Sequence, residues 1–594
     1  MIILGISESH TCTAALSVDG EIVAAVSEER LSRRKGEMGF PEKAISYCLQ
    51  HIPSHRKLDR VCLSVNALPP YTLMISRAHK FNIRDHINAQ HEYFKPMLIG
   101  GDSNNTANRN YFGPLIENAD LSETNYLWDR FKPSFHRTDD IEKFREIRFN
   151  TIVKYTGIDR KDIIYNDHHK CHAAYAYYAS PFRKKDALVL TMDGIGDGVN
   201  CTVSVVKNDK INEILRTDKC TIGKHWRYIT LLLGMKPEEH EYKVMGLAPY
   251  AKEYMSKEVE SIFNEHLIVD NIDFKYKSKP TDLYFYYKEI LEGHRFDAIA
   301  GGLQSFTEKI IQEWVANCVN HTNIRRVVFS GGVAMNIKVN KVVAEMPEVE
   351  EFFVAPSGGD ESLALGTCFF ENAKNDINNK PLQNIYIGPF FSDNEIEMAL
   401  QGHQFKIIRN VTNKELAQFL AEGNIIARCV GKMGFGARAL GNRSIIANPS
   451  KWETVEKIND KIKFRDFWMP FTPTILSDRI KDYVCNPKGF LSPYMTIAFN
   501  TTDLAKRDLK AAIHPKDKTI RPQVLEKEHN PEYYDLIKEF EKITGIGGLL
   551  NTSLNLHGEP VVCSPVDAVH TFVNSELDML LINNYLICRE HNHV

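Results

Sequence analysis

The sequence of 594 residues has little net charge and no long apolar run. Its 73 Lys and Arg nearly balance its 76 Asp and Glu, and the formal net charge is −3. Without a global basic field, bulk binding of nucleic acid is not favoured. No uncharged apolar run approaches the roughly 20 residues of a membrane span, and the first residues lack the basic and apolar regions of a signal peptide. The sequence therefore predicts a cytoplasmic protein with no membrane or nucleic-acid partner.

The sequence also lacks two common site signatures. Its 12 cysteines include no Cys-x-x-Cys pair, which favours reduced thiols over a disulfide framework or a zinc finger. The Walker spacing of a P-loop is absent as well. The length and the 43% content of apolar residues predict two to four domains with large cores.

Two stretches of the chain repeat one plan of strand, turn, strand, turn, strand. The first runs over residues 2–6, 14–18 and 22–26, with the turn Asp19-Gly20, and the second over residues 187–191, 202–206 and 211–215. Asp-Gly between apolar runs is a strong hairpin signal. Two such units about 185 residues apart predict a duplicated α/β core with a cleft between its halves. Two ordinary hairpins are the alternative.

An alanine-rich helix is predicted to begin with three histidines. Asn166 or Asp167 can cap it, and His168 and His172 then share one face at i and i+4, close enough to bind one metal ion. A metal site needs at least one more ligand. Asp360, between a predicted strand at 352–356 and a predicted helix at 363–372, is a third ligand or only a helix cap. A solvated polar first turn is the alternative for the histidines.

Other segments favour a nucleotide and an anion. A predicted helix over residues 300–319 precedes a strand and the turn Ser330-Gly331-Gly332, another place for a phosphate or ribose. Residues 66–150 have little periodicity and predict an insertion over a site, or equally a solvated surface excursion.

After an expected linker at 373–384, a second domain carries cations beside glycine turns and a polar turn after a strand. A phosphate pocket and a solvated basic face both remain open for this part. Its cations and polar residues include Lys432, Arg438, Arg443, Lys461, Lys463, Arg465, His514, Lys516, Lys518, Arg521 and the turn 551–555.

Taken together, these residues resemble the NodU/CmcH/TobZ family of carbamoyltransferases over nearly the whole chain. The motifs that carry the resemblance, as they stand here, are His10 with Ala14-Ala-Leu; Glu28-Glu29-Arg30-Leu-Ser-Arg33-Arg34-Lys35; His168-His-x-x-His172; Asp193-Gly; Glu241-Tyr-Lys243-Val-Met-Gly246-Leu-Ala-Pro-Tyr250; Ser330-Gly-Gly-Val-Ala-Met-Asn336; Gly436-Ala-Arg438-Ala-Leu-Gly-Asn-Arg443-Ser444; and Asn551-Thr-Ser-x-Asn555-x-x-Gly558-Glu559-Pro560.

The resemblance implies an architecture and a reaction. Residues 1–372 would form a duplicated actin-like domain similar to TsaD (the ASKHA fold), with the insertion at about 66–150. Residues 385–594 would form a YrdC-like α/β domain. In such enzymes carbamoyl phosphate and ATP give carbamoyl adenylate in the second domain, and the first passes the carbamoyl group to a hydroxyl of a small molecule, typically in natural-product biosynthesis.

The resemblance also implies site residues. His10 would be the catalytic base, and the metal, Fe²⁺ by resemblance and with Mg²⁺ a further candidate beside ATP, would bind His168, His172, Asp360 and Asp193. The ATP or adenylate site would comprise Lys243, Gly301, Gln304, Gly331, Gly332 and Asn336. The carbamoyl phosphate site would comprise Arg438, Lys463, Arg521, Ser553 and Asn555.

Two positions depart from the family pattern. The second arginine of the family motif after Lys463 is Met469 here, and the family's Asp-x-Ser after His10 is Thr11-Cys12-Thr13. The first change removes one expected phosphate ligand.

Two other functions compete with this interpretation. A HypF-like enzyme would carbamoylate a protein thiol, but HypF proteins carry zinc fingers that this chain lacks. A non-catalytic actin-fold nucleotide-binding protein would not need the cations of the second domain. The acceptor cannot be predicted beyond a small-molecule hydroxyl, and a homodimer is one possible oligomeric state.

Overall fold

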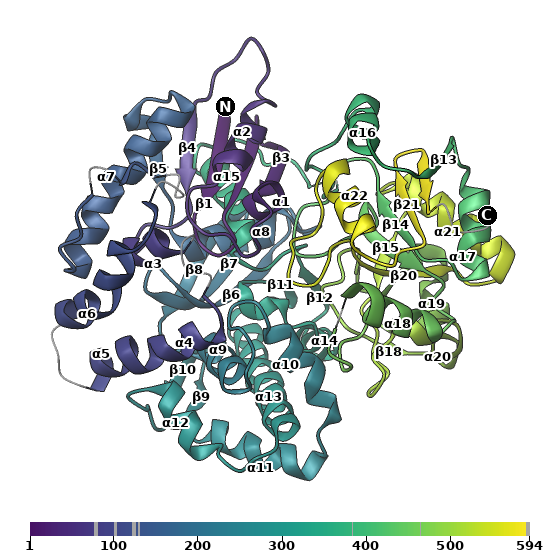
Figure 1. Cartoon of the computed structure of the whole chain (residues 1–594). Coiled ribbons are helices and arrows are strands. Elements are labelled where there is room, and N and C mark those ends of the chain that lie inside the picture. The colour runs from purple at the N-terminus through teal and green to yellow at the C-terminus, as the bar shows by residue number, and fades with distance from the viewer. Residues whose placement is uncertain are drawn as a thin grey trace. The chain divides into compact units, whose positions relative to one another are not determined.

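The computed structural model describes residues 1–76, 81–99, 104–121, 126–128, 131–382, 384–463 and 465–589 (Figure 1). Contacts between Cα atoms divide the chain into two compact units. The first comprises Met1–Glu28, Gly36–Asn336 and Gly358–Pro381, and the second comprises Glu29–Lys35, Ile337–Ser357 and Leu382–Val594. The expected linker at 373–384 begins within the last residues of helix α15 (Leu363–Lys374). The domain boundaries expected from the sequence stay a prediction.

The first sheet of the N-terminal unit begins with an antiparallel meander. Strands β1 (Ile2–Ser7), β2 (Thr13–Val18) and β3 (Glu21–Ser27) follow one another, and Asp19 and Gly20 form the β2–β3 turn with positive φ angles of 50° and 84°. Strand β4 (Arg60–Leu63) then pairs parallel with β1, and β5 (Ile163–Tyr165) pairs parallel with β4. Strand β1 is buried along its whole length, as its apolar run predicts.

The second sheet repeats this arrangement strand by strand, in the order β12-β11-β6-β7-β8, where β12 is Glu351–Val354. Strands β6 (Ala187–Gly196), β7 (Val199–Lys207) and β8 (Lys210–Thr217) form the meander, and β11 (Arg326–Ser330) pairs parallel with β6. A meander followed by a parallel fourth strand occurs in both halves. The predicted duplicated α/β fold is therefore confirmed, because two ordinary hairpins would not share the parallel strand.

Two helices pack together beside the sheets, and small residues let them approach closely. Helix α8 (His168–Tyr178) contacts β6, and α15 contacts both α8 and β1. A Cβ atom on Gly5 would lie 2.0 Å from the Ala364 main-chain oxygen, and one on Gly366 would lie 2.2 Å from that of Cys171. Glycine at these two positions allows the close contact of β1, α15 and α8.

The remaining elements of this unit are mostly helical. They are α2 (Glu42–Leu49), α9 (Ile222–Leu232), α10 (Glu241–Leu247), α11 (Glu253–Asn264), α12 (Leu283–Ile290) and α13 (Phe296–Thr322), with the hairpin β9 (Leu267–Asp270) and β10 (Asp273–Tyr276). Helix α1 (Glu28–Ser32) begins at the last residue of this unit's first segment, and its other residues belong to the second unit.

The segment predicted as an irregular insertion is mostly helical in its described parts. Its helices are α3 (Pro70–Ile75), α4 (Ile83–Ala89), α5 (Lys95–Ile99), α6 (Asn104–Glu117) and α7 (Arg137–Thr156). Tyr71, Tyr93 and Phe112 form the centre of a separate aromatic core here. Part of the predicted polar stretch, residues 100–103, lies outside the described residues.

The C-terminal unit is built on a mixed sheet of eight strands, in the order β13-β22-β21-β14-β15-β20-β16-β19. These strands are β13 (Lys406–Arg409), β14 (Ile426–Cys429), β15 (Arg443–Ala447), β16 (Thr472–Leu476), β19 (Gln523–Leu525), β20 (Gly548–Ser553), β21 (Met579–Ile582) and β22 (Tyr585–Cys588). This separate α/β sheet agrees with the expected fold class.

Helices cover this sheet, and three of them begin with a capping box in which a Ser or Thr and a Glu or Asp satisfy each other's main-chain amides. The helices and short elements of the unit are α14 (Ile337–Glu345), β12 (Glu351–Val354), α16 (Asp393–Leu400), α17 (Asn413–Glu422), α18 (Glu453–Ile458), α19 (Ile480–Tyr483), β17 (Val484–Cys485), β18 (Asn500–Thr501), α20 (Asp503–Asp508), α21 (Pro531–Thr544) and α22 (Pro565–Val573).

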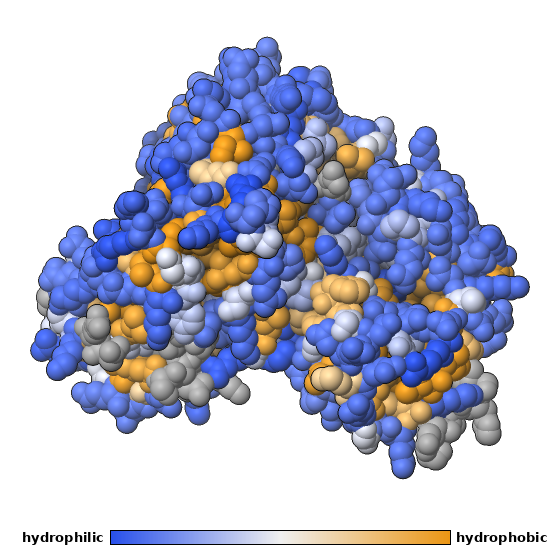
Figure 2. Space-filling view, turned by 90° about the horizontal axis from the view of Figure 1, so that it is seen from above, coloured by the Kyte–Doolittle hydropathy of each residue, from blue (hydrophilic) through white to orange (hydrophobic). Residues whose placement is uncertain are grey.

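The face drawn in Figure 2 is mostly hydrophilic, with apolar patches between the polar side chains. Within the described ranges, none of the helices combines the length and the apolar composition needed to cross a bilayer.

Candidate functional site

The histidine helix begins as predicted. Asp167 is its N-cap, and the Asp167 side chain accepts a hydrogen bond of 3.0 Å from the main-chain amide of Lys170. His168 and His172 are both buried, and their ring centres lie 4.7 Å apart on one face. The alternative of a solvated polar turn is wrong, because the fold buries this face of α8.

Two carboxylates join the histidine pair. Nε2 of His168 lies 3.2 Å from Oδ2 of Asp193, and Oδ1 of Asp360 lies 3.5 Å from Nε2 of His172. One ligand atom from each of the four residues lies within 4.8 Å of every other. Asp193 comes from the last part of β6, and Asp360 follows Gly359 in a short 3₁₀ turn. The fold thus assembles all four residues that were predicted as metal ligands.

The donor set fits a divalent metal ion. Nε2 of His172 is buried and has no hydrogen-bond partner among the residues that the structure describes, which leaves a costly unsatisfied atom unless a ligand binds there. Two imidazoles with two carboxylates suit a first-row divalent cation. Outer partners fix the donors: Ser330 Oγ lies 3.4 Å from Nδ1 of His172, and the Gly332 amide donates to Asp193 over 2.9 Å.

The electrostatics of the four-residue cluster are dominated by its two carboxylates. Burial opposes a charge on His168, but the carboxylates of Asp360 and Asp193 raise the pKa of His168 to about 9. Burial would raise the pKa of Asp193, but the hydrogen bond and the charge of the adjacent His168 lower that pKa well below its usual range. The His168 imidazole therefore holds a proton at neutral pH, and a metal ion that bound there would displace that proton.

His169, between the two candidate ligands, has a structural role. Its ring nitrogens contact Thr191 Oγ1 at 2.8 Å and the main-chain oxygen of Val199 at 3.0 Å. Burial and repulsion from His168 and His172 lower the pKa of His169 to about 3. A neutral, fully bonded imidazole of this kind holds α8 against the second sheet.

Asp197 is a site residue that the sequence did not single out. Its carboxylate accepts hydrogen bonds from the amide of His168 at 3.1 Å, of Asn66 at 3.0 Å and of Ala67 at 2.9 Å. It thereby ties the start of α8 to the segment after β4. The only signal was its place in the glycine-rich turn after β6.

The predicted base His10 lies in the loop after β1. A Cβ atom on Gly36, whose φ is +67°, would lie 3.1 Å from Nε2 of His10 and 3.3 Å from Oε1 of Glu239. The imidazole and the Glu239 carboxylate therefore border one notch that is kept open by a glycine. In the described part of the chain no hydrogen bond or ion pair joins His10 to the four metal-site residues, and its catalytic role stays a prediction.

The predicted adenylate residues are only partly brought together. Gln304 and Asn336 exchange two side-chain hydrogen bonds of 3.3 and 3.0 Å. Gly332 contacts Asp193 and so borders the metal cluster, and the adjacent Gly331 has a φ of +97° that requires glycine.

Two other predicted adenylate residues lie on helices and are not part of these contacts. A Cβ atom on Gly301 would lie 2.3 Å from Ser256 Oγ, so this glycine serves the packing of α13 against α11. Lys243 lies half-buried on α10.

In the C-terminal unit, three predicted carbamoyl phosphate residues meet around one ammonium group. Nζ of Lys463 donates to the main-chain oxygens of Ser553 and Asn555, the second at 3.0 Å, and to Asn555 Oδ1 at 2.6 Å and Ser553 Oγ at 3.3 Å. The side chain is 3% exposed. Burial and repulsion from Arg465 and Lys35 lower the pKa of Lys463 well below its usual range.

Arg521 has the features of an anion ligand. Its Nε atom is buried and has no hydrogen-bond partner among the described residues. Burial and the nearby charges of Arg438 and Arg465 lower the pKa of Arg521 well below its usual range. Arg465, not among the predicted ligands, donates to Thr552 Oγ1 at 2.9 Å. Such repulsion between gathered cations is relieved when an anion binds.

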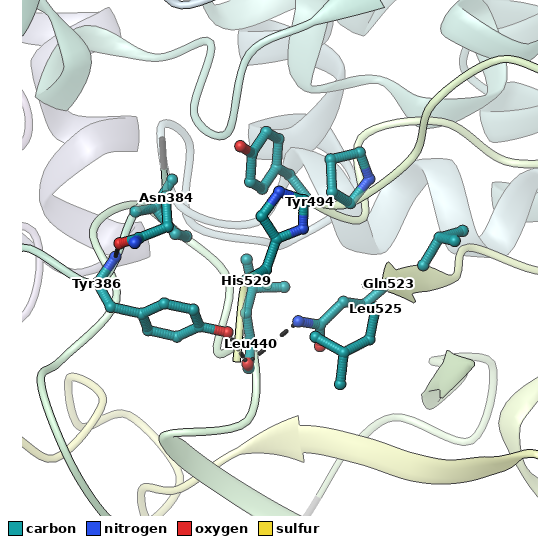
Figure 3. Close-up of a pocket in the computed structure, with 10 residues that line it drawn as sticks. Asn384, Tyr386, Leu440, Tyr494, Gln523, Leu525 and His529 are labelled. Carbon is teal, nitrogen blue, oxygen red and sulfur yellow. Dashed lines mark hydrogen bonds between the residues drawn. The ribbon is translucent and has the colours of Figure 1, made fainter. Parts of the chain in front are cut away.

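Hydrogen bonds around a small pocket hold two of these arginine segments together (Figure 3). The hydroxyl of Tyr386 and the amide of Gln523 both point to the carbonyl oxygen of Leu440, at 2.6 and 3.2 Å. Leu440 lies two residues after Arg438, and Gln523 two residues after Arg521. These hydrogen bonds thus link the two segments that carry the arginines.

Arg443 and Met469, two other positions near the cations, have structural roles. Arg443 is buried and donates to the main-chain oxygens of Cys563, at 2.9 Å, and Val430, at 2.8 Å. It therefore stabilises the glycine-rich turn from within. Met469, which stands in place of the family arginine, lies in a turn where its amide donates to the Asp466 main-chain oxygen at 3.0 Å.

Comparison with known proteins matches residues 2–369 to the family model Carbamoyltransferase N-terminus and residues 417–589 to Carbamoyltransferase C-terminus. The uncharacterized protein MJ1051 of Methanocaldococcus jannaschii is 33% identical over 99% of this chain and 100% of its own length. The nodulation protein NolNO of Sinorhizobium fredii is 28% identical over 97% of this chain and 79% of its own. Nodulation protein U of Bradyrhizobium diazoefficiens is 29% identical over 45% of this chain and 46% of its own.

Among solved structures, component A of (R)-2-hydroxyglutaryl-CoA dehydratase from Acidaminococcus fermentans covers 63% of this chain and 99% of its own, at 17% identity and a TM-score of 0.31. So low a score adds nothing to the fold that the two sheets already show.

Proposed function

The chain belongs to the carbamoyltransferase family and is a carbamoyltransferase, and from this premise we propose that it transfers the carbamoyl group to a hydroxyl of a small molecule in an ATP-dependent reaction. In the proposed first step water cleaves carbamoyl phosphate to carbamate and phosphate, and a carbamate oxygen then attacks the α-phosphate of ATP, which gives carbamoyl adenylate and releases pyrophosphate. In the second, the acceptor oxygen attacks the carbamoyl carbon and AMP leaves.

The observation that carries the first step is the group of cations in the C-terminal unit. Arg521 is a guanidinium with a buried, unpartnered Nε and two further arginines close enough to repel it. An arrangement of this kind costs free energy without an anion, and a labile phosphate needs cations in a water-poor pocket. Lys463 contributes by holding the turn of Ser553 and Asn555 in place.

The second step is proposed for the N-terminal unit. When bound, a divalent metal would polarise a phosphate or carbonyl oxygen at this site, and His168, His172, Asp193 and Asp360 would hold it. His10 would take the proton from the acceptor hydroxyl, because an imidazole is a suitable base near neutral pH. Gln304, Asn336 and the amides after β11 would orient the nucleotide.

Pyrophosphate release tests the first step. The wild-type protein with carbamoyl phosphate and ATP should release pyrophosphate, and Arg438→Ala and Arg521→Met should each lower this rate by about 10²–10³-fold, since a charge-assisted contact to phosphate is worth some 2–4 kcal/mol. Arg507→Ala removes an arginine whose side chain is 75% exposed and serves as the control. Wild-type release by Arg521→Met would show that the pocket lies elsewhere.

The acceptor can be found by a screen. The protein, carbamoyl phosphate, ATP and a panel of hydroxylated metabolites are incubated, and mass spectrometry detects a carbamoyl gain. His10→Asn should keep pyrophosphate release and lower product formation by about 10²–10⁴-fold, the usual contribution of a general base. Carbamoylation of a protein thiol, or ATP binding without pyrophosphate release, would instead support the HypF-like or the non-catalytic alternative.

A further inference from the structure

A buried ion pair joins the insertion to the loop that carries His10. Arg148 on α7 and Glu8, two residues before His10, each have side chains only 1% exposed. Nε of Arg148 donates to Glu8 Oε2 over 2.9 Å, and its terminal nitrogen donates to the same oxygen. The hydroxyl of Tyr126 donates to Oε1 over 2.6 Å. Both carboxylate oxygens are therefore held by the insertion.

The same guanidinium also holds the segment after β4. It donates to the main-chain oxygens of Val65 at 2.8 Å and Asn66 at 3.3 Å, and it lies 4.8 Å from the centre of the Tyr165 ring. Only a planar group with several donors can serve Glu8 and these carbonyls at once. Arg148 is thus the point where the insertion, β1 and β4 are joined.

From this point the contacts continue to the candidate metal site. The amides of Asn66 and Ala67 donate to Asp197, and Asp197 also accepts from the amide of His168, the first residue of α8. On the other side, the Glu8 main-chain oxygen accepts from the amide of Gly39 at 2.9 Å. Gly39 lies three residues after Gly36, which borders the His10 ring.

We propose that Arg148 and Glu8 are positioning residues of the transfer site, which fix the His10 loop relative to the first turn of the metal-binding helix α8. The insertion then contributes to the geometry of the site from α7 and not only as a cover. The proposal rests on the proposed function for the role of His10, but the contacts are independent of that role.

A plain structural ion pair is the competing explanation, and charge-neutral replacement separates the two. The double variant Glu8→Gln/Arg148→Met removes both charges, so no unpaired charge stays buried. Arg148→Lys keeps the charge but cannot bridge both sides, and it is the second variant. The control is Glu260→Gln/Lys309→Met, which removes another ion pair of the same unit, between α11 and α13, at 2.6 Å.

Two readouts report on the two ends of the network without an acceptor. The rate of His10 modification by diethyl pyrocarbonate, followed by peptide mass spectrometry, reports the accessibility and the surroundings of the imidazole. The visible absorption of Co²⁺-loaded protein reports the geometry of the histidine–aspartate cluster. Circular dichroism shows whether each variant is folded.

In the double variant and in Arg148→Lys we expect the His10 modification rate to change at least about 3-fold and the Co²⁺ spectrum to shift, while the control matches the wild type. Wild-type values of both readouts in either folded variant would overturn the proposal. Neither readout uses carbamoyl phosphate, so a wild-type protein that releases no pyrophosphate would refute the proposed function and leave this result standing.

Discussion

Nε2 of His168 lies 3.2 Å from Oδ2 of Asp193, although the two residues come from different elements. His168 is the first residue of α8, and Asp193 lies three residues before Gly196, the end of β6. The last part of the strand thus carries the carboxylate that the first residue of the helix contacts. This contact is one edge of the four-residue cluster, from which the first prediction follows.

Removing a ligand should empty the metal site. His168→Ala and Asp360→Ala should each lower divalent-metal affinity by more than about 100-fold, because even the loss of an outer-shell partner costs about 10–100-fold. Ser330→Ala, which loses only the contact to Nδ1 of His172, should fall in that smaller range. Titration with Co²⁺ or Fe²⁺ and elemental analysis measure the effect, and His136→Ala, half exposed on the surface, is the control. Full occupancy in both ligand variants would make the cluster structural.

Lys463→Met should disturb the anion pocket because Ser553 and Asn555 lose the ammonium group that holds them. The ammonium serves four oxygens of Ser553 and Asn555, and its loss removes a charged donor from each of them at a cost of about 1–3 kcal/mol. We expect a lower melting temperature and no thermal shift on adding carbamoyl phosphate. Lys516→Met, an exposed lysine in the same unit, is the control. A stable variant that still shows the carbamoyl phosphate shift would contradict this role.

Local sequence patterns predicted three residues of the site. The i, i+4 spacing of His168 and His172 fixes their common face once the helix forms, and Asp360 was a candidate because it follows a predicted strand. Asp193 was expected as a ligand only from the family resemblance. The duplicated meander could be predicted as well, because each copy is a local run of apolar stretches and turns.

What the sequence could not show depends on contacts between distant segments. Asp197 matters because three amides from two other segments converge on it. Arg443 and Arg521 look alike in sequence, but one donates to main-chain oxygens and the other has an unpartnered Nε. The role of Arg148 follows from the fold of the insertion, whose mixed composition carries no periodic signal. The role of such a polar side chain can be assigned only after its hydrogen-bond partners are known.

Gly36→Ala should disturb the notch beside His10. At a φ of +67° a Cβ costs about 1–2 kcal/mol, and here it would also press on His10 Nε2 and Glu239 Oε1. We expect normal pyrophosphate release but at least about 10-fold less carbamoylated product from the acceptor found by screening. Gly157→Ala is the matched control, because its φ is +69° and no atom lies within 4 Å of the added Cβ. Equal losses in the two variants would mean that backbone strain alone is responsible.

The last prediction concerns the pH dependence of stability at Glu241. This residue opens α10, and its carboxylate accepts a hydrogen bond of 2.7 Å from the amide of Glu238. Burial raises the pKa of Glu241 to about 7, from an ordinary value of 4.5. Between these two values the folded protein holds a proton that the unfolded chain has lost, so stability falls as the pH rises. Above about pH 7 the full penalty, on the order of 3 kcal/mol, is present.

Glu241→Gln removes the charge and keeps an oxygen that can accept from the Glu238 amide. The variant should therefore unfold at a higher temperature than the wild type at about pH 8. At about pH 4.5 the two should unfold at nearly the same temperature, because Glu241 is protonated in the folded wild type and so is as neutral as the glutamine. Melting temperatures at the two pH values measure this, with Glu289→Gln, an exposed carboxylate of the same unit, as the control. A stabilisation that is equal at both pH values would have to come from packing, since the ionisation of Glu241 can act only at the higher pH.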